Sequence, residues 1–214
     1  PLDGGSIAML NLARSLSRLG HEITVLTMST PKHQLTIEDK QEFSKMMTVH
    51  SVYVNTKLRF PAMVRNLLFS REPYIAIRFI SDAFESMLVE LLSSETFDIV
   101  QLEGLYLTPY IPVIRKYSNA LVALRAHNVE HAIWQRLAAT VGNPLKKWYF
   151  GILARRIKRF ESEAIDSYDV LLPITAYDLE NYVKMGNTRP AYVCPAGIDT
   201  ESAGTTLKQP HTMH

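Results

Sequence analysis

The chain has 214 residues, of which 47% are hydrophobic, and its 23 basic and 21 acidic side chains give a net charge of +2. This length fits one large domain or two small ones, and the apolar content is typical of a globular protein with a substantial core. The near balance of charge argues against a dedicated nucleic-acid-binding protein. Cys194 is the only cysteine, which excludes an intramolecular disulfide and a cysteine-based zinc site and is compatible with a reducing cytoplasm. The sequence contains no apolar run of the roughly 18 residues that a membrane-spanning helix needs.

The first 28 residues predict a loop, a helix and a strand. Gly4 and Gly5 predict a turn, and Ser6 is expected to cap the helix that follows. Gly20 is expected to end this helix, and the branched, apolar residues 23–26 predict a buried strand. The free N–H groups of a helix start beside glycines favour an anion such as phosphate, although glycine pairs are equally ordinary turn residues. Four apolar side chains recur at helical spacing along the predicted helix: Met9, Leu12, Leu16 and Leu19.

The rest of the chain alternates between strand and helix patterns. Thr175 and Asp178 resemble a capping box, and Gly186 is expected to end the helix that they start. The pattern predicts an α/β fold: a Rossmann-like, doubly wound, mostly parallel sheet with helices on both faces. Strands are expected at 47–54, 97–102, 120–124, 170–174 and 191–194. Helices are expected at 57–94 with a break near Pro73, at 106–117 with bends at Pro109 and Pro112, and at 132–139, 144–167 and 175–185.

Two of the predicted helical stretches carry many basic side chains. In residues 57–94 these lie among aromatic residues, and in residues 144–167 they form a dense series. Core packing and a solvated helix face are the ordinary interpretations, and a surface that faces an acceptor, a membrane or a polyanion is the alternative. The basic residues are Arg59, Arg65, Arg71 and Arg78 in the first stretch, and Lys146, Lys147, Arg155, Arg156, Lys158 and Arg159 in the second.

Polar residues follow the predicted strands at one edge of the sheet. In a parallel sheet, ligands bind at the carboxyl ends of the strands, where Glu103, His127 and the Gly4–Gly5 loop are expected to lie. A neutral imidazole at position 127 can exchange a hydrogen bond or a proton with a ligand hydroxyl, or it can simply bond a nearby carbonyl. Glu103 can act as a base or hold a hydroxyl, or it can be merely solvated. Asn128 is a natural cap for the next helix.

The residues His127, Glu130 and His131 also fit the H-x-x-E-H pattern of zinc metallopeptidases. That mechanism needs both histidines on one regular helix. We expect His127 to lie at a strand exit, before the helix begins, so the pattern argues only weakly for a zinc site.

Four segments resemble a known family when they are taken together. PLDGG at the start, LSRLGHEITVLT, RAHNVEHAIWQRLA and YVCPAGIDT resemble the N-terminal domain of the GT-B glycosyltransferases, in particular family 4. The resemblance extends from Pro1 to Asp199 in the order and spacing of the family. It implies transfer of a sugar, of hexosyltransferase type, from a nucleotide-diphosphate-sugar co-substrate to a glycan or lipid-linked acceptor.

The resemblance also implies where the ligands bind. The N-terminal domain would hold the acceptor, backbone N–H groups would stabilise the leaving diphosphate, and neither a metal nor another cofactor would be required. Carried over position by position, the implied roles are donor-diphosphate binding by Gly4, Gly5 and Ser6, catalysis by His127 and Glu103, acceptor binding by Arg125, Asn128 and Glu130, and an interdomain hinge at Pro195, Gly197 and Asp199.

Compared with the family, the sequence departs at both ends. We expect residues 1–199 to be the N-terminal domain without its first strand, 200–214 to be a polar tail or the start of a linker, and the nucleotide-binding domain to be absent. Such a fragment is expected to fold, to be inactive alone and to self-associate through the gap in its sheet. A cytoplasmic enzyme of polysaccharide or cell-envelope synthesis, at the inner face of the membrane if it makes peripheral contact, fits this resemblance. A nucleotide-sugar epimerase and a non-catalytic sugar-binding module remain alternatives.

Overall fold

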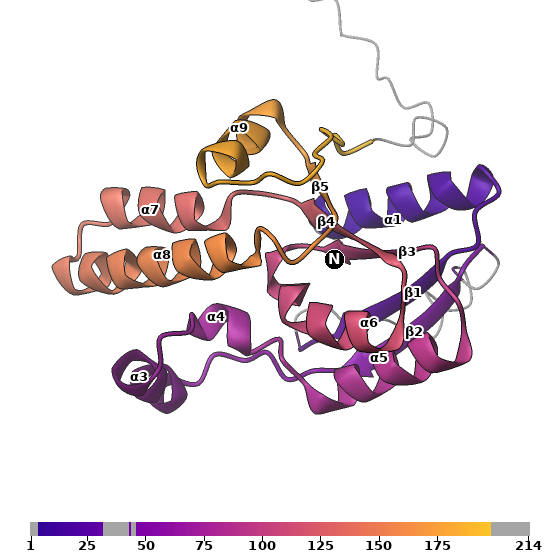
Figure 1. Ribbon diagram of the computed structural model, residues 1–214. Helices are drawn as coiled ribbons and strands as arrows, with labels where there is room; N and C mark the ends of the chain where they lie inside the picture. The colour runs from indigo at the N-terminus through magenta and orange to yellow at the C-terminus, as the bar shows by residue number, and fades with distance from the viewer. Residues whose placement is uncertain (1–3, 32–42, 44–45, 198–214) are drawn as a thin grey trace, which may run out of the picture.

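The computed structural model describes residues 4–31, 43 and 46–197 (Figure 1). The calls on Asp199 and on the tail at 200–214 lie outside these residues. The helices are α1 (Gly4–Arg18), α3 (Phe60–Phe69), α4 (Tyr74–Ile77), α5 (Asp82–Ser94), the 3-10 helix η1 (Leu105–Tyr110), α6 (Ile111–Tyr117), α7 (Glu130–Thr140), α8 (Pro144–Ala164) and α9 (Ala176–Lys184). The strands are β1 (Thr24–Ser29), β2 (Thr48–Tyr53), β3 (Ile99–Glu103), β4 (Leu121–Ala126) and β5 (Val170–Pro173).

The strands form two parallel sheets. β1 pairs with β2, and β3, β4 and β5 pair in that order. Among the described residues, no strand pairing joins the two sheets. Side chains link them instead, because Leu26 and Met28 of β1 pack against the core cluster that contains Leu102 of β3. The predicted α/β fold with parallel strands is therefore confirmed.

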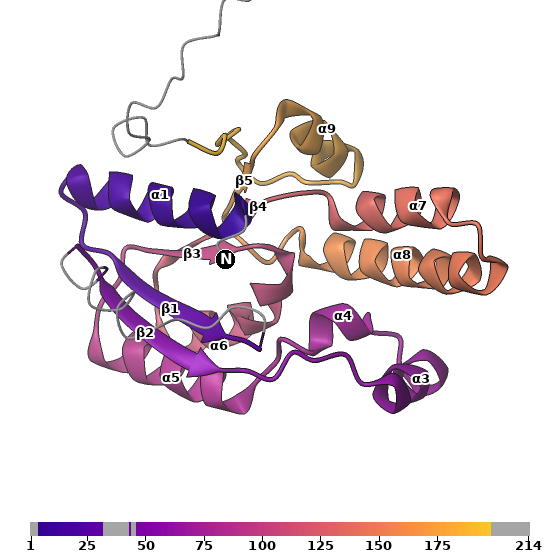
Figure 2. The same ribbon diagram turned by 180° about the vertical axis from the view of Figure 1, so that it is seen from behind.

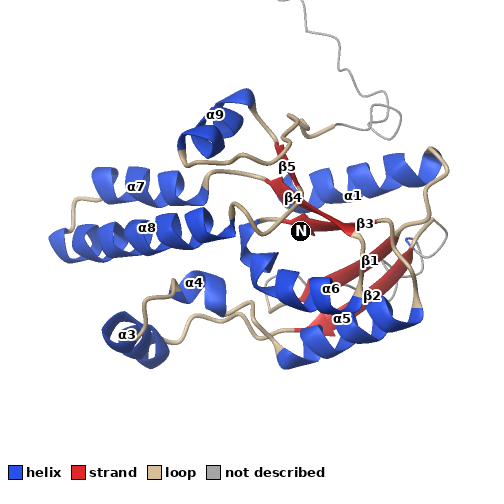
Figure 3. Ribbon diagram, viewed as in Figure 1, coloured by secondary structure: helices blue, strands red, loops and turns tan. Residues whose placement is uncertain are grey.

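Helices surround these sheets (Figures 1 to 3). α1 lies on the opposite side of the strands from α5 and α6, and α7 and α8 form an antiparallel pair that extends beyond the strands. The main core lies between the sheets, α5 and α6, and it includes Phe84, Ile114 and Leu124. β4 has a strand on each side, and its five residues after Leu121 are all buried. A second cluster, which includes Leu105 and Ile157, joins η1 to α8.

Several helix ends follow the sequence signals. Thr175 Oγ1 accepts a hydrogen bond from Asp178 N at 3.0 Å, which confirms the predicted cap of α9. Asn143 caps α8 in the same way, through Lys146 N at 3.0 Å. Gly20 and Gly186 follow α1 and α9 with φ of 92° and 103°, a backbone conformation that side chains disfavour, so both predicted helix ends are confirmed.

The start of the chain differs from the prediction. α1 begins at Gly4, so Gly4 and Gly5 lie in its first turn, and Ser6 is inside the helix instead of preceding it as a cap. The glycine signal favours a turn because glycine is costly in a helix interior, by about 0.5–1 kcal/mol relative to alanine. At a helix start, the first N–H groups have no acceptor within the helix. The apolar side chains that follow extend the helix back to Gly4.

Three other elements also differ in extent. Residues 57–94 divide into α3, α4 and α5, and Pro73 directly precedes α4, as the predicted break requires. Residues 106–117 change from the 3-10 helix η1 to α6 at Ile111, between the two prolines. Residues 191–194 make only one parallel bridge, from Ala191 to Leu171, although Cys194 N still donates to Pro173 O at 2.8 Å.

Shortening a buried side chain of the central strand should lower the stability of the protein. Leu124 of β4 is 0% exposed, and Leu124→Ala is expected to lower the free energy of unfolding by about 2–5 kcal/mol because it removes buried contacts and leaves a cavity. Denaturant unfolding measures the loss. Leu145→Ala, at an exposed position in the first turn of α8, is the matched control and should change stability by at most about 0.5 kcal/mol. Equal losses in the two variants would contradict this account of the core.

Candidate functional site

The carboxyl ends of β3 and β4 bring three polar side chains together. Glu103 is the last residue of β3, and its register partner on β4 is Arg125. His127 lies just past the end of β4, two residues after Arg125 and therefore directed to the same side of the strand. The predicted meeting of Glu103 and His127 at this edge follows from the parallel pairing of the two strands.

Glu103 is the centre of this cluster. Its Oε2 atom lies 2.6 Å from His127 Nε2 and 3.2 Å from Arg125 Nη1, and its Oε1 atom accepts a hydrogen bond from Gln101 Nε2 at 2.5 Å. The Arg125 side chain is only 1% exposed, whereas those of Glu103 and His127 are each 21% exposed. Arg125 thus supports the cluster from inside the protein, and Glu103 and His127 are the members that a ligand can reach.

The surroundings of Glu103 keep it ionised. Burial acts to raise the pKa of its carboxyl, but the hydrogen bond with His127 and the charges of Arg125 and His127 outweigh burial and hold the pKa below its usual range. A carboxylate can only accept hydrogen bonds, so His127 Nε2 must be the donor. In the neutral imidazole, Nδ1 is then the acceptor, which is the nitrogen that can take a hydrogen bond or a proton from a hydroxyl.

A second carboxylate holds the start of α7. Glu161 of α8 is 0% exposed, and the preceding Val129 gives α7 no side-chain cap. Glu161 Oε1 accepts from Glu130 N at 3.1 Å and from Tyr182 Oη at 2.9 Å. Its Oε2 atom accepts from His131 N at 3.3 Å and lies 2.6 Å from His131 Nδ1. A side chain from another helix therefore caps α7 and favourably opposes its dipole.

Glu130 faces the protein interior. Its Oε2 atom accepts a hydrogen bond from Tyr106 Oη at 2.8 Å. Burial raises the pKa of Glu130, the nearby Glu161 raises it further, and the bond from Tyr106 opposes both effects only in part. Burial and the carboxylate of Glu130 raise the pKa of Tyr106, so its hydroxyl remains a donor.

The histidines of the H-x-x-E-H pattern have separate partners. His127 precedes α7 and contacts Glu103, while His131 lies inside α7 and contacts Glu161. The expectation that His127 lies at the strand exit is confirmed, and the two side chains do not share one regular helix. Within the part of the chain that the structure describes, no group of three or more His, Cys, Asp or Glu side chains is placed to hold a metal ion.

The other predicted site residues are not among the contacts of Glu103. Asn128 is exposed in the turn before α7, and Gly4 and Gly5 form the first turn of α1. Pro195 and Gly197 lie in exposed coil after the bridge to β5, and Asn11 Nδ2 donates to Gly197 O at 3.4 Å, which ties α1 to this segment. Ligand contacts by these residues, and acceptor contact by the buried Arg125, remain predictions.

The sequence reasoning missed four residues that position the site. Gln101 is detectable in principle, because it precedes Glu103 by two residues and so shares its side of β3. Glu161 also leaves a signal, since it is an acidic residue on the buried face that contains Ile157 and Ala164. The roles of the other two depend on contacts between distant segments: Tyr106 and Tyr182.

Comparison with known proteins identifies the family. The family model for Glycosyltransferase Family 4 matches residues 2–202, so the chain belongs to this family. No curated protein matches the chain. Among solved structures, the chain is similar to the crystal structure of Glycyrrhiza uralensis UGT73P12 complexed with glycyrrhetinic acid 3-O-monoglucuronide, with 13% sequence identity and a TM-score of 0.48. The match covers 90% of this chain and 47% of that chain, so this chain spans about half the length of the structure it matches.

The described helices include none whose length and apolar character would let it cross a membrane.

Two substitutions should change the pH dependence of stability in opposite directions. The folded pKa of Glu103 lies below its unfolded value, so its stabilising effect is present above the unfolded pKa and is lost as the pH falls through the folded pKa. The folded pKa of Glu130 lies above its unfolded value, so its ionisation costs stability as the pH rises.

We therefore expect the free energy of unfolding to rise less steeply with pH in Glu103→Gln than in the wild type below about pH 5, and to rise more steeply in Glu130→Gln than in the wild type above about pH 4. Urea unfolding at a series of pH values measures both slopes. A change of the same sign in both variants would contradict the two assigned pKa directions.

Loss of the carboxylate at position 161 should destabilise the α7–α8 pair. Glu161→Ala leaves two backbone N–H groups and the Tyr182 hydroxyl without their acceptor, and we expect a loss of about 3 kcal/mol or more. Glu163→Ala, two residues further along α8 at an exposed position, should cost at most about 0.5 kcal/mol. Thermal or urea unfolding of the two variants measures the losses of stability. A small loss in Glu161→Ala would contradict the role of Glu161 as the cap of α7.

Proposed function

We propose that this chain is the acceptor-side domain of a glycosyltransferase that moves a sugar from a nucleotide-diphosphate-sugar to a hydroxyl of a glycan or lipid-linked acceptor. The observation that carries the proposal is the Glu103–His127 pair at the carboxyl ends of β3 and β4, in a member of Glycosyltransferase Family 4. Parallel α/β sheets bind their ligands at this edge. We further assign the transferred group to the hexoses.

The pair provides a directed proton acceptor. Glu103 accepts the Nε2 hydrogen of His127 and leaves Nδ1 to bond a hydroxyl of the acceptor or of the transferred sugar. Arg125 acts as a positioning residue, because its buried guanidinium holds the Glu103 carboxylate in place and ionised. In this proposal Asn128, beside His127 on the exposed side, contacts the acceptor.

The start of α1 is assigned to the donor. The N–H groups of Gly4, Gly5 and Ser6 belong to the first turn of a 15-residue helix, where the helix dipole favours an anion. Stabilising the leaving diphosphate in this way needs no cofactor besides the nucleotide sugar. Pro195, Gly197 and Asp199 are assigned to an interdomain hinge.

The cellular setting belongs to the same proposal. We place the enzyme in the cytoplasm at the inner face of the membrane, in the synthesis of a cell-envelope polysaccharide. Within the described residues, β1 and β3 each pair on one side only, which supports the proposal that this chain, studied alone, self-associates and transfers little sugar.

Replacement of His127 tests the mechanism. In the transfer-competent protein that contains this domain, His127→Ala is expected to lower kcat/KM by about 100-fold or more, because the proton acceptor at the edge of the sheet is lost. The free energy of unfolding should change by no more than about 1 kcal/mol, since the side chain is partly exposed. Transfer is measured as nucleotide release and as labelled sugar in the acceptor.

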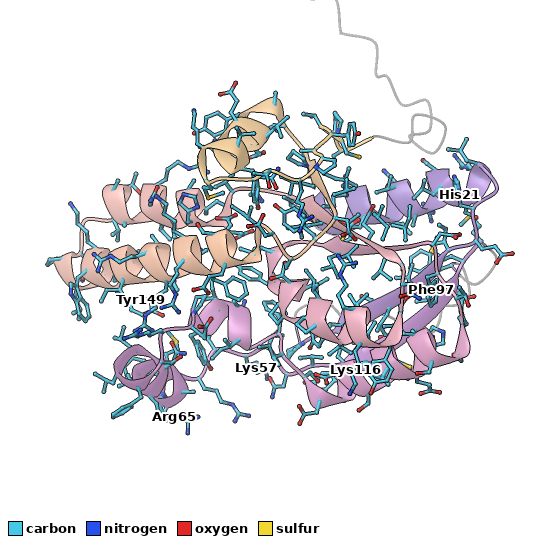
Figure 4. All side chains as sticks on the ribbon, viewed as in Figure 1. His21, Lys57, Arg65, Phe97, Lys116 and Tyr149 are labelled. Atoms are coloured by element: carbon cyan, nitrogen blue, oxygen red, sulfur yellow. The ribbon has the colours of Figure 1, made fainter. Side chains whose placement is uncertain are left out.

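His21→Ala is the matched control, because this histidine is exposed in the turn after α1 (Figure 4). It should leave kcat/KM unchanged. Equal activity of His127→Ala and the wild type would exclude His127 from the mechanism. Conversion of a free nucleotide sugar without any acceptor would instead identify an epimerase.

A further inference from the structure

Helix α3 exposes several large apolar side chains. Phe60 is 75% exposed, Leu68 is 67% exposed and Phe69 is 84% exposed, and the half-exposed Val64 lies between them. Phe60, Val64 and Leu68 recur every four residues and so lie along one side of the helix, and Phe69 extends this exposed apolar surface at the end of the helix. A surface helix normally buries its apolar side chains against the core, so the exposure of this stripe is unusual.

Polar contacts fix this orientation. Asn66, on the inner side of α3, is buried, and its Oδ1 and carbonyl oxygen atoms each accept from Arg156 Nη1 of α8 at 3.2 Å. Arg156 Nη2 also donates to Leu67 O at 2.7 Å. After the helix, Glu72 accepts from Arg159 Nη2 at 3.0 Å. A rotation that buried the apolar stripe would break the bonds made by Arg156, so the stripe stays exposed.

The segment that carries these side chains contains only basic charges. Residues 57–71 contain four basic side chains and no acidic one, and Leu58 adds a further exposed apolar side chain. The basic residues are all exposed, and in Figure 4 Arg65 extends from the side of α3 away from α8. The helix itself lies at the margin of the molecule, below the α7–α8 pair in the view of Figure 1. The four basic residues are Lys57, Arg59, Arg65 and Arg71.

We propose that α3 and the segment 57–59 before it dock the protein on an anionic lipid bilayer. An apolar stripe with cations beside it fits the boundary between acyl chains and negatively charged headgroups, where the two interactions add. The ten residues of α3 are too few to span the bilayer, so the helix lies in its surface. A two-fold contact with a second copy would place the four cations of each chain against the same four of its partner, which disfavours that occupant.

This inference does not depend on the proposed transfer reaction, since membrane binding is measured without any sugar. Together with the proposed function, it would bring the acceptor edge close to a lipid-linked substrate.

Vesicle co-sedimentation of the 214-residue chain tests the proposal. We expect binding to phosphatidylcholine vesicles that contain about 30% phosphatidylglycerol, and at least about tenfold weaker binding to pure phosphatidylcholine. Binding should fall in about 0.5 M NaCl, which screens the cations. The triple variant Phe60→Ser, Leu68→Ser and Phe69→Ser should partition into anionic vesicles at least about tenfold more weakly than the wild type.

Matched controls separate docking from general hydrophobicity and from misfolding. Leu19→Ser and Tyr177→Ser remove large exposed side chains from other parts of the surface and should bind vesicles like the wild type. Circular dichroism melting should show the triple variant folded, because the replaced side chains are exposed. Failure of the wild type to bind anionic vesicles, or equal binding by the folded triple variant, would overturn the proposal. A wild-type dimer that the triple variant converts to a monomer, without vesicle binding, would assign α3 to self-association instead.

Discussion

The position of the site depends on the buried carboxylate of Glu161, which is not itself a member of the site. It has no exposed surface, and it receives hydrogen bonds from two backbone N–H groups of α7 and from Tyr182 of α9. Burial of a carboxyl group is costly unless its lone pairs are satisfied, so this arrangement favours one placement of the three helices. The turn from His127 to Val129 runs between β4 and the capped end of α7. Its position therefore depends on an acidic residue that has no exposed surface.

The second constraint is the pairing of β3 with β4. Their register places Glu103 opposite Arg125, and the two-residue period of a strand directs His127 toward the same carboxylate. A shift of one residue would turn these side chains to the opposite face and separate the charges. Burial of Arg125 is tolerated because Glu103 pairs with it, and this pairing keeps Glu103 ionised as the partner of His127. The register of β3 and β4 thus determines both the packing in the sheet and the arrangement of polar side chains at its edge.

Local signals in the sequence predicted the alternation of strands and helices, the Thr175 cap and the place of His127 after a buried strand. These signals failed where contacts between distant segments determine the structure. The glycine pair at 4–5 satisfies a turn or a helix start equally well, and the structure uses it in α1. The position of Glu161 on the apolar face of α8 is visible in the sequence, but its hydrogen-bond donors in α7 and α9 are not. Core packing is the ordinary interpretation of residues 57–94, but in α3 the bonds of Arg156 to Asn66 and Leu67 leave Phe60 and Phe69 exposed.

The division of the strands into two sheets has a consequence for local unfolding. β4 has backbone hydrogen bonds to strands on both sides, whereas β1 shares a ladder only with β2 among the described residues. Opening of the β1–β2 pair therefore costs side-chain packing against the common core but breaks no ladder with β3. Segments of this kind open as cooperative units with free energies below that of global unfolding. We therefore expect the amide hydrogens of β1 and β2 to exchange with solvent when the β1–β2 pair opens. Those of β4 should exchange only when the whole domain unfolds.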